Sequence, residues 1–481
     1  MNATIATRRH PLKPLTKCIA SALLLVGFAE PAFATVFTVT SCADSAVGNT
    51  TAGTLRAEVT LANAAATATS NDRVDLAACR NSTITLYSGA VPITAPSLTI
   101  GAQTGADGGV VIQGSNDRVF AHTGSGTVDF KYMTVKNGQT LSSGIALGGC
   151  IYSTGTVTVT GSTITDCVAN ASGNFASGGA IFAQTAITLR ESVVSGSAAA
   201  SFGASKGGGV ATPGNLTLDY STIHGNFALG RNGGEGFGGG VSGSGVISIN
   251  NSTLDGNYAQ TSGGAFAFSQ VGGTRGSASI TNSTISGNIA GIKGGASYIE
   301  GANLGIYNST IAFNSAGAAG EGQFGGLYVY GFSALILQSS IFANNVDSSA
   351  VHDLFANYSR SVTVSSGSSD NLARTSNVQP GIIISTADPK LAPLQNHGGP
   401  TRTHALLPGS PAINQGNDGG SFTADQRGNG FARVVDGHAD IGAYEHQTDD
   451  DEIFYNGMEP DTQAPVPPLI EWADRFGDSP R

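Results

Sequence analysis

Charged and aromatic side chains are scarce in this sequence of 481 residues, at 12 % and 7 % of the chain. So little charge excludes a charge-rich disordered chain, and the lack of long apolar runs excludes a bundle of membrane helices. Lys and Arg number 23 against 33 Asp and Glu, so the net charge of −10 has the wrong sign for a nucleic-acid-binding surface. Glycine is abundant, with 68 residues, but it follows no strict third-residue period, which excludes collagen.

The N-terminus carries the three parts of an export signal. Basic residues come first, an apolar stretch covers residues 19–28, and the small-x-small triplet Ala32-Phe33-Ala34 follows. This order predicts a signal peptide over residues 1–34 and an extracellular or cell-surface location, with the periplasm as the alternative. The apolar stretch is too short to cross a bilayer, and no transmembrane segment is expected elsewhere.

Four cysteines remain after residue 34, and an even number in an exported chain predicts disulfides. Four cysteines allow three pairings. We prefer the two pairs that are close in sequence, Cys42 with Cys79 and Cys150 with Cys167. Their spacings match no zinc-binding pattern, so no metal is expected there.

The middle of the chain repeats with a period of about thirty residues. A Ser-Thr-aliphatic motif recurs at intervals of 26 to 31 residues, and a Gly-Gly pair keeps step with it. An alternating aliphatic run, such as Val157/Val159 or Ile187/Leu189, precedes most of the motifs and is typical of a strand with one buried face. The aliphatic anchors should stack into one core: Ile164, Ile223, Leu254, Ile285, Ile311 and Ile341.

These features predict an all-β parallel solenoid in which each repeat makes one turn of short strands. We expect eight to eleven turns. Stacked at about 4.8 Å, they would form a rod roughly 40–50 Å long. Like charges stacked at that spacing repel, which explains their scarcity. Amide side chains that recur in register can hydrogen bond to one another, which predicts a ladder at one corner: Asn226, Asn257, Asn288, Asn314 and Asn344.

The repeats over residues 125–346 resemble those of bacterial surface proteins, including polymorphic outer-membrane-protein-like adhesins. In that group, Gly-Gly-Ala and Asn-Ser-Thr-Ile-x-Gly-Asn motifs belong to a right-handed, single-stranded parallel β-helix of the pectin-lyase type. The resemblance implies a structural or adhesive role at a cell surface.

Both ends of the repeat region carry further motifs. Residues 54–63 have helical spacing and are similar, in part, to the Cys-Ser-Leu-Arg-Glu-Ala motif of exported proteins; we expect a short helix that caps the first turn. Residues 388–445, with Asn396-His397-Gly398-Gly399-Pro400 and Asp440-Ile441-Gly442-Ala443-Tyr444-Glu445, resemble the choice-of-anchor Q family. That resemblance implies an irregular cap over the last turn of an exported β-helix.

The charges of this C-terminal region predict that ion pairs fix its loops, with Arg427, Asp440 and Glu445 among them. The predicted organisation is a signal at 1–34, an N-terminal cap and first turns at 35–124, repeats at 125–346, last turns and cap at 347–445, and an acidic, proline-containing flexible tail at 446–481.

Two columns of polar residues invite a catalytic interpretation. Ser195, His224 and Asp255 stand one position after the anchor on successive turns, in the order of a nucleophile, a base and an orienting acid. Arg190 and Asp219 stand in a second column, and pectin-cleaving β-helices use Arg with clustered Asp, sometimes with Ca²⁺. Solvated turn residues and a surface ion pair explain the same columns, and we prefer these interpretations.

We therefore predict no catalytic residue and no cofactor. The leading hypothesis is an exported or surface β-helix that binds a polysaccharide or another cell-surface ligand, acts as a monomer and does not bind nucleic acid. The alternative is a polysaccharide lyase or glycoside hydrolase on the same scaffold, and only that alternative would call for Ca²⁺.

Overall fold

The computed structural model describes residues 34–44, 51–66, 71–269, 276–317, 324–331, 333–348, 350–356, 362–379, 381–417 and 422–447. The predicted signal peptide, apart from Ala34, and the predicted tail, apart from His446 and Gln447, lie outside these residues.

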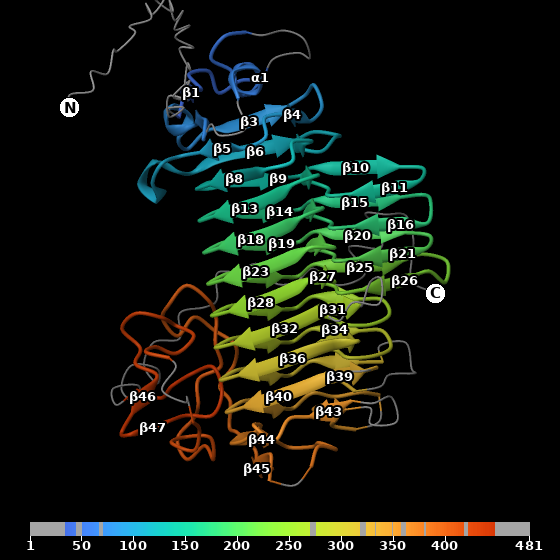
Figure 1. Ribbon diagram of the computed structural model, residues 1–481, viewed down its shortest axis with the longest axis vertical. Helices are drawn as coiled ribbons and strands as arrows, with labels where there is room; N and C mark the ends of the chain where they lie inside the picture. Colours follow the sequence, from blue (N-terminus) through green and yellow to red (C-terminus); the bar gives the residue numbers. More distant parts are fainter. Residues whose placement is uncertain are drawn as a thin grey trace, which may run out of the picture. The chain divides into compact units, whose positions relative to one another are not determined.

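The chain forms a parallel β-helix of about nine turns (Figure 1). One turn runs from Ile151 to Ser177 and contains five short strands. The next turn begins at Ile181, which pairs in parallel with Ile151, thirty positions earlier. The prediction that one repeat makes one turn is confirmed.

Three parallel sheets form the body of the helix. Sheet 1 contains β1 (Val36–Thr38), β2 (Arg73–Asp75), β5 (Leu98–Gly101), β8 (Thr127–Lys131), β13 (Thr156–Thr160), β18 (Ala186–Arg190), β23 (Asn215–Asp219), β28 (Val246–Asn250), β32 (Gly276–Thr281), β36 (Ala302–Tyr307), β40 (Ala334–Gln338) and β43 (Thr363–Val364). Sheet 2 contains β3 (Thr83–Leu86), β6 (Val110–Gly114), β9 (Met133–Lys136), β14 (Thr163–Thr165), β19 (Val193–Ser195), β24 (Thr222–His224), β29 (Thr253–Asp255), β33 (Thr284–Ser286), β37 (Thr310–Ala312), β41 (Ile341–Ala343), β44 (Asn371–Ala373) and β45 (Ile383–Ser385). Sheet 3 contains β4 (Val91–Ile93), β7 (Phe120–His122), β12 (Ile151–Ser153), β17 (Ile181–Ala183), β22 (Val210–Thr212), β27 (Val241–Gly243), β31 (Phe266–Ser269), β35 (Ser297–Glu300), β39 (Leu327–Tyr330) and β42 (Leu354–Ala356).

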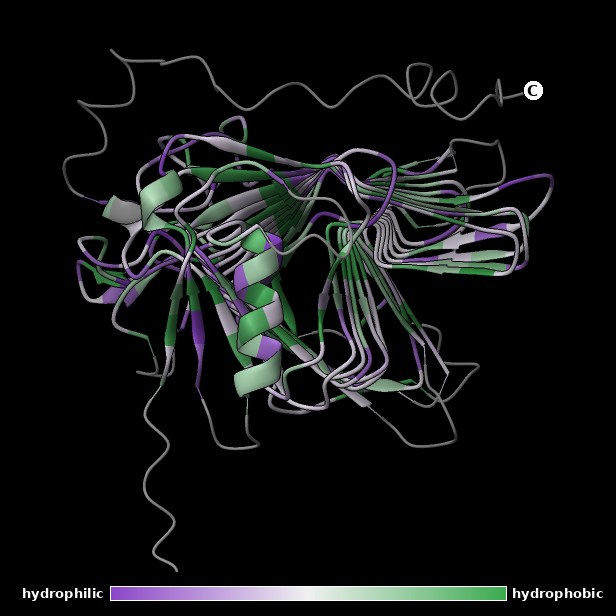
Figure 2. Ribbon diagram, turned by 90° about the horizontal axis from the view of Figure 1, so that it is seen from above, coloured by the Kyte–Doolittle hydropathy of each residue, from purple (hydrophilic) through white to green (hydrophobic). Residues whose placement is uncertain are grey.

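Two further sheets form a side arm that the sequence analysis did not predict (Figures 1 and 2). Sheet 4 contains β10 (Gln139–Ser142), β15 (Val168–Ala171), β20 (Ala198–Ser201), β25 (Phe227–Gly230), β30 (Tyr258–Ala259), β34 (Ile289–Ala290) and β38 (Ser315–Ala316). Sheet 5 contains β11 (Ile145–Leu147), β16 (Phe175–Ser177), β21 (Ala204–Lys206) and β26 (Glu235–Phe237). A small buried cluster of alanines, which includes Ala146, Ala169 and Ala176, packs between these two layers.

The core fills the interior of the three body sheets. Alternating aliphatic residues such as Val157 and Val159 are fully buried and pair in register with Ile187 and Leu189 of the next turn. Each such side chain contributes roughly 1.5–3 kcal/mol on burial. The alternation read from the sequence therefore gives the inward phase of sheet 1 correctly.

The corner between sheets 1 and 2 explains the Asn-Ser-Thr motif. Asn251 and Asn282 occupy this corner with φ of +49° and +44°, a left-handed conformation that asparagine tolerates better than most residues. The serine that follows each of them joins successive turns, since Ser252 N–H donates to Ser283 Oγ at 3.1 Å.

An asparagine ladder forms at the corner between sheet 2 and the side arm. Asn226 Nδ2 donates to Asn257 Oδ1 at 3.0 Å, and the same bond joins Asn257 to Asn288 and Asn288 to Asn314. The next member is Asn345, which accepts from Asn314 Nδ2 at 2.8 Å. The prediction for Asn344 is therefore wrong: Asn344 has a φ of +59°, and its side chain accepts from Arg374 outside the ladder.

The predicted core stack is wrong at Ile341, again by one residue. Ile311 pairs with Phe342, so Phe342 takes the interior position and Ile341 points outward. Ile164, Ile223, Leu254, Ile285 and Ile311 do lie in the core. The adjacent serines 339 and 340 caused the error, because the motif can be aligned on either of them; Ser340 is the true counterpart of Ser309.

The N-terminal end is capped as expected. Helix α1 (Leu55–Ala65) begins after Thr54, whose hydroxyl accepts from Ala57 N–H, and it packs against β1, β2 and β4. The short 3₁₀ helices η1 (Ala77–Cys79) and η2 (Gly105–Asp107) lie nearby in sequence. Both preferred disulfides form, Cys42–Cys79 and Cys150–Cys167. No helix among the described residues is long and apolar enough to cross a membrane.

The C-terminal region is not the end cap that the sequence analysis expected. Residues 388–447, here called the lateral module, lie beside sheet 2 (Figure 1) and bond to β29, β33 and β37 through Thr253, Thr284 and Thr310. The strands among the described residues of this module are β46 (Val434–Val435) and β47 (His438–Ala439). At the C-terminal end of the helix, Ile382, next to the last strand β45, joins the main core.

Candidate functional site

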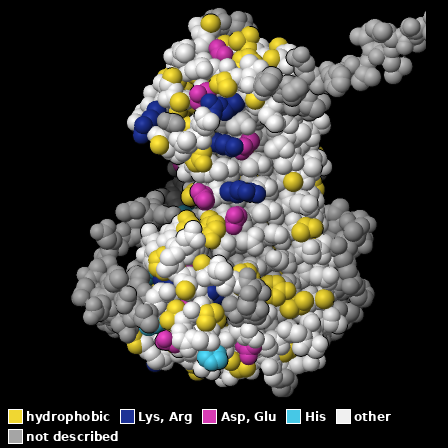
Figure 3. Space-filling view, turned by 60° about the vertical axis from the view of Figure 1, so that its left-hand side comes forward, with side chains coloured by type: hydrophobic (Ala, Val, Ile, Leu, Met, Phe, Trp, Pro, Cys, Tyr) yellow, Lys and Arg dark blue, Asp and Glu magenta, His cyan; other side chains and the backbone are white. Residues whose placement is uncertain are grey.

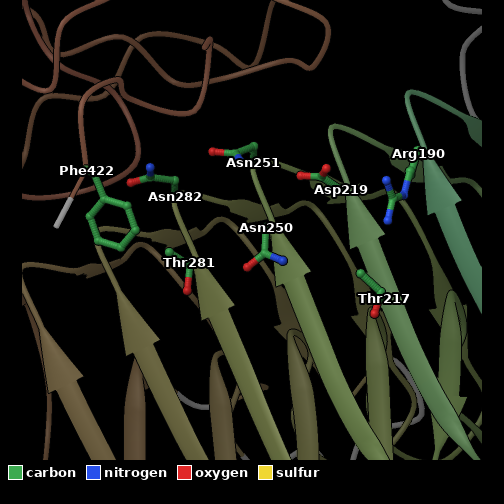
Figure 4. Close-up of a pocket in the computed structure, with 8 residues that line it drawn as sticks. All are labelled: Arg190, Thr217, Asp219, Asn250, Asn251, Thr281, Asn282 and Phe422. Atoms are coloured by element: carbon green, nitrogen blue, oxygen red, sulfur yellow. The ribbon is translucent and has the colours of Figure 1, made fainter.

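A shallow pocket opens where sheet 1 ends and the lateral module begins (Figure 4). Its volume is about 310 Å³. The lining side chains come from four successive turns and from the lateral module: Arg190, Thr217, Asp219, Asn250, Asn251, Thr281, Asn282 and Phe422.

The regular fold of the helix places most of these residues. Arg190, Asp219, Asn250 and Thr281 each end a strand of sheet 1, and the strands pair in register, so the four residues form one column. The corner residues that follow two of these strands, Asn251 and Asn282, add a second polar row. Phe422 provides the one aromatic side chain of the lining.

Several polar groups of the pocket are open to a ligand. The side chains of Arg190, Asp219 and Asn250 hydrogen bond to no other described residue, and no ion pair joins Arg190 to Asp219. The preferred interpretation of these two as a surface ion pair is therefore wrong, although they do lie on adjacent strands. Asn282 is 3 % exposed; its Nδ2 donates to Ala424 O at 3.1 Å, while its buried Oδ1 has no hydrogen-bond partner within the described chain.

Side chains of both charges lie near one another on one face of the molecule (Figure 3). Lys131 pairs with Asp129 at 2.9 Å. It belongs to the same column as Arg190, two strands earlier in sheet 1. Burial raises the pKa of Asp129, and Lys131 and Arg190 oppose this shift. Burial, together with the charges of Asp219 and Asp425, raises the pKa of Tyr220, so its phenol stays protonated at neutral pH. The surface therefore offers donors and acceptors without a strong net charge.

The first predicted column is only partly assembled. Ser195, His224 and Asp255 do lie on successive strands of sheet 2. His224 Nδ1 lies 2.7 Å from Asp255 Oδ2, but Ser195 Oγ donates to Thr165 Oγ1 at 3.1 Å in the opposite direction along the column.

Arg402 of the lateral module completes this cluster. Its Nη2 donates to Asp255 Oδ2 at 2.5 Å and lies 3.2 Å from His224 Nδ1. The side chains of Asp255 and Arg402 are only 7 % and 11 % exposed. The sequence suggested that this column is exposed to solvent. In the structure, the lateral module buries its last member, Asp255.

The charged residues of the lateral module are buried within it. Arg427 pairs with Asp425 through Nε and Nη2, at 3.0 and 2.7 Å, and lies between the rings of Phe431 and Tyr444. Glu445 pairs with Arg433 at 3.9 Å and also accepts from the N–H groups of Val435 and Asp440, while Asp440 accepts from Asn414 N–H. Burial and the neighbouring Asp440 raise the pKa of Glu445 to about 8. These three residues stabilise irregular loops, as the charge pattern suggested for the region.

Asn251, Asn282 and Phe422 are among the pocket residues that the sequence analysis missed. The two asparagines belong to the repeated Asn-Ser-Thr motif, and a separate look at its first position could have found them. No sequence signal points to Phe422, because its place depends on how the lateral module packs. Within the described residues, no group of three or more His, Cys, Asp and Glu is placed to hold a metal ion.

Comparison with known proteins adds no name: no family model matches the chain, and no curated protein matches it. The chain is a parallel β-helix with two disulfides, and neither resemblance to a family is supported by these searches.

Proposed function

We propose that the protein is an exported β-helix that binds a glycan in the pocket at the end of sheet 1. The observation that carries the proposal is the lining itself: amide, hydroxyl, carboxylate and guanidinium groups in register, beside one aromatic ring. Sugars present alternating hydroxyl groups that both donate and accept, and planar side chains such as Arg, Asp and Asn meet two of them at once. A few placed polar groups beside an aromatic side chain are typical of a small-molecule site.

The side chains of Arg190, Asp219 and Asn250 support a ligand with hydroxyl groups, because they hydrogen bond to no other described residue and offer both donors and acceptors. Because the pocket is open on one side, it can hold either an internal sugar unit or the end of a longer glycan. The predicted signal peptide and the two disulfides fit an oxidising compartment outside the cytoplasm, where such ligands occur.

The role is best described as binding without catalysis, in keeping with the resemblance to surface adhesins. Among the described residues, Asp219 is the only carboxylate that lines the pocket, and Ser195 is not bonded to His224. Attachment to a surface polysaccharide by such a pocket would be reversible and would gain strength from repeated units along the glycan.

Calorimetry of the purified chain with a panel of neutral and uronic-acid polysaccharides tests the proposal. Binding of at least one glycan is expected, and Asn250→Ala or Arg190→Gln should weaken it by about tenfold, since each removes bonds to the ligand. Arg80→Gln, at an exposed arginine outside the pocket, is the matched control and should bind normally. Absence of binding across the panel, or equal binding by all three variants, would contradict the proposal. Release of unsaturated uronides, seen as new ultraviolet absorption, would instead favour a lyase.

A further inference from the structure

We propose that the outer edge of the side arm, formed by β10 and β11, pairs with the same edge of a second copy of this chain. The proposal is independent of glycan binding. It rests on how this edge differs from the other sheet edges of the molecule.

The edge is open along its backbone. The even-numbered residues of this segment face β15. Gly138 O, just before β10, accepts from Val168 N–H, and Ser142 O accepts from Ser172 N–H, both at 2.9 Å. Because bonding alternates along a parallel strand, Leu141 turns its N–H and C=O away from β15, toward the open side. In each sheet, the described chain supplies a neighbour on one side only: β15 for β10 and β16 for β11.

Apolar side chains accompany this open backbone. Leu141 is 62 % exposed and Ile145 is 61 % exposed, the two highest values among the described leucines and isoleucines. The sequence from Asn137 to Thr165 contains no charged residue. Natural sheets protect open edges with charge, proline, bulges or a covering element, and this edge has neither charge nor proline.

The corresponding edge of the body is protected. Asn63 of α1 covers β4: its Nδ2 donates to Pro92 O, and its Oδ1 accepts from Thr94 and Ala95 N–H. At the outer edge of the side arm, the covering contacts made by described residues lie at its base, where Asp117 O accepts from Gln139 N–H and Arg118 donates to Leu147 O and Gly148 O. No described residue covers the edge backbone between these contacts. The outer part of the β10 and β11 edge is therefore open.

A second copy is the occupant that fits best. The far edge of sheet 5 ends in β26 with exposed Glu235, and sheet 4 narrows to two-residue strands, so neither offers a matching surface for head-to-tail stacking. A copy related by a twofold axis presents an equally long, uncharged edge and pairs antiparallel with it, which closes the assembly at two chains. In a protein of net charge −10, this uncharged surface is also where two copies meet with least repulsion.

Sedimentation velocity of the full chain over a range of concentrations tests the proposal. The wild-type chain should form a concentration-dependent dimer. Leu141→Lys and Ile145→Lys should each raise its dissociation constant by at least about tenfold, because a lysine at the pairing edge must be desolvated. Val246→Lys, at a 48 % exposed position of sheet 1, is the matched control and should leave the dimer unchanged.

At a concentration at which the wild type is monomeric, thermal unfolding of all three variants should match that of the wild type, since the exchanged side chains are exposed. A wild-type chain that stays monomeric at every concentration would overturn the proposal. So would a dimer that both edge variants retain.

Discussion

The outer face of sheet 2 has two halves with nearly the same sequence pattern and different surroundings. In β14 and β19 the outward residues are only partly buried, whereas in β29, β33 and β37 all three residues of each strand are buried. The lateral module makes the difference, because it covers only the second half. A Ser or Thr that meets solvent in one turn thus becomes a docking contact a few turns later.

The largest effect of this covering is expected at the ion pair between Asp255 and Arg402. Arg402→Ala leaves the buried carboxylate of Asp255 without its closest partner and should lower the free energy of unfolding by about 3–5 kcal/mol. As a reference outside sheet 2, Lys131→Ala breaks the more exposed pair with Asp129 on β8 of sheet 1 and should cost less than about 1 kcal/mol. Urea denaturation measures both. Similar losses would mean that the lateral module does not bury its half of sheet 2.

Two neighbouring residues of β29 sharpen the comparison between the core and the docked surface. Leu254 points into the core, and Leu254→Ala should cost about 2–5 kcal/mol. Asp255 points outward, yet Asp255→Ala should also cost several kcal/mol, roughly 3, because Arg402 is then left buried beneath the module. Its counterpart in the uncovered half, Ser195, should tolerate alanine within about 0.5 kcal/mol. A harmless Asp255→Ala in urea denaturation would show that the surface there is open.

Acid should weaken the covered half selectively. Burial lowers the pKa of His404 to about 4, while its Nδ1 and Nε2 bond to Ala392 O and Ser286 Oγ. The unfolded chain therefore binds a proton that the folded chain does not, and stability falls as the pH drops from about 6.5 to about 4, by roughly 3 kcal/mol in all. Glu445 acts in the opposite sense: its raised pKa gives stability that is present below about 4.5 and lost as the pH rises through about 8.

His404→Gln isolates the first of these terms. The amide keeps polar contacts but does not titrate, so denaturation midpoints measured between pH 6.5 and 4.5 should vary less than in the wild type. An unchanged pH dependence would assign the acid sensitivity to other groups.

The smallest effect separates two threonines at equivalent positions. Thr284 Oγ1 donates to buried Gln426 Oε1 at 2.6 Å, so Thr284→Val should cost about 1–3 kcal/mol. Thr163, which belongs to the uncovered half, should accept valine within about 0.5 kcal/mol. Equal midpoints for the two variants would contradict the docking contact.

The sequence predicted the repeated contacts of the three body sheets and missed the side arm and the position of the lateral module. Periodicity alone located the inward anchors and the asparagine ladder, because every turn repeats the same contacts. It failed by one residue at Ile341 and Asn344, where two adjacent serines made the alignment ambiguous. The side arm escaped notice because its core is made of alanines, which give a weak strand signal.

Only part of the pocket could be predicted from the sequence. Arg190 and Asp219 could be placed on adjacent strands from the repeat length, since strand register follows from it. Phe422 of the pocket and Arg402 of the neighbouring cluster could not, because they reach the helix through contacts between residues about 140 or more positions apart. Such contacts depend on the packing of irregular loops, for which the chain has no periodic pattern.

A double-mutant cycle between Asp255 and Arg402 tests most directly that residues 388–447 pack along the side of the helix. With Asp255→Asn, Arg402→Met and the double variant, the structure predicts a coupling energy above about 1 kcal/mol, since the two side chains share one buried contact. Losses that add to within about 0.5 kcal/mol would place the two residues apart and contradict the docked position of the lateral module.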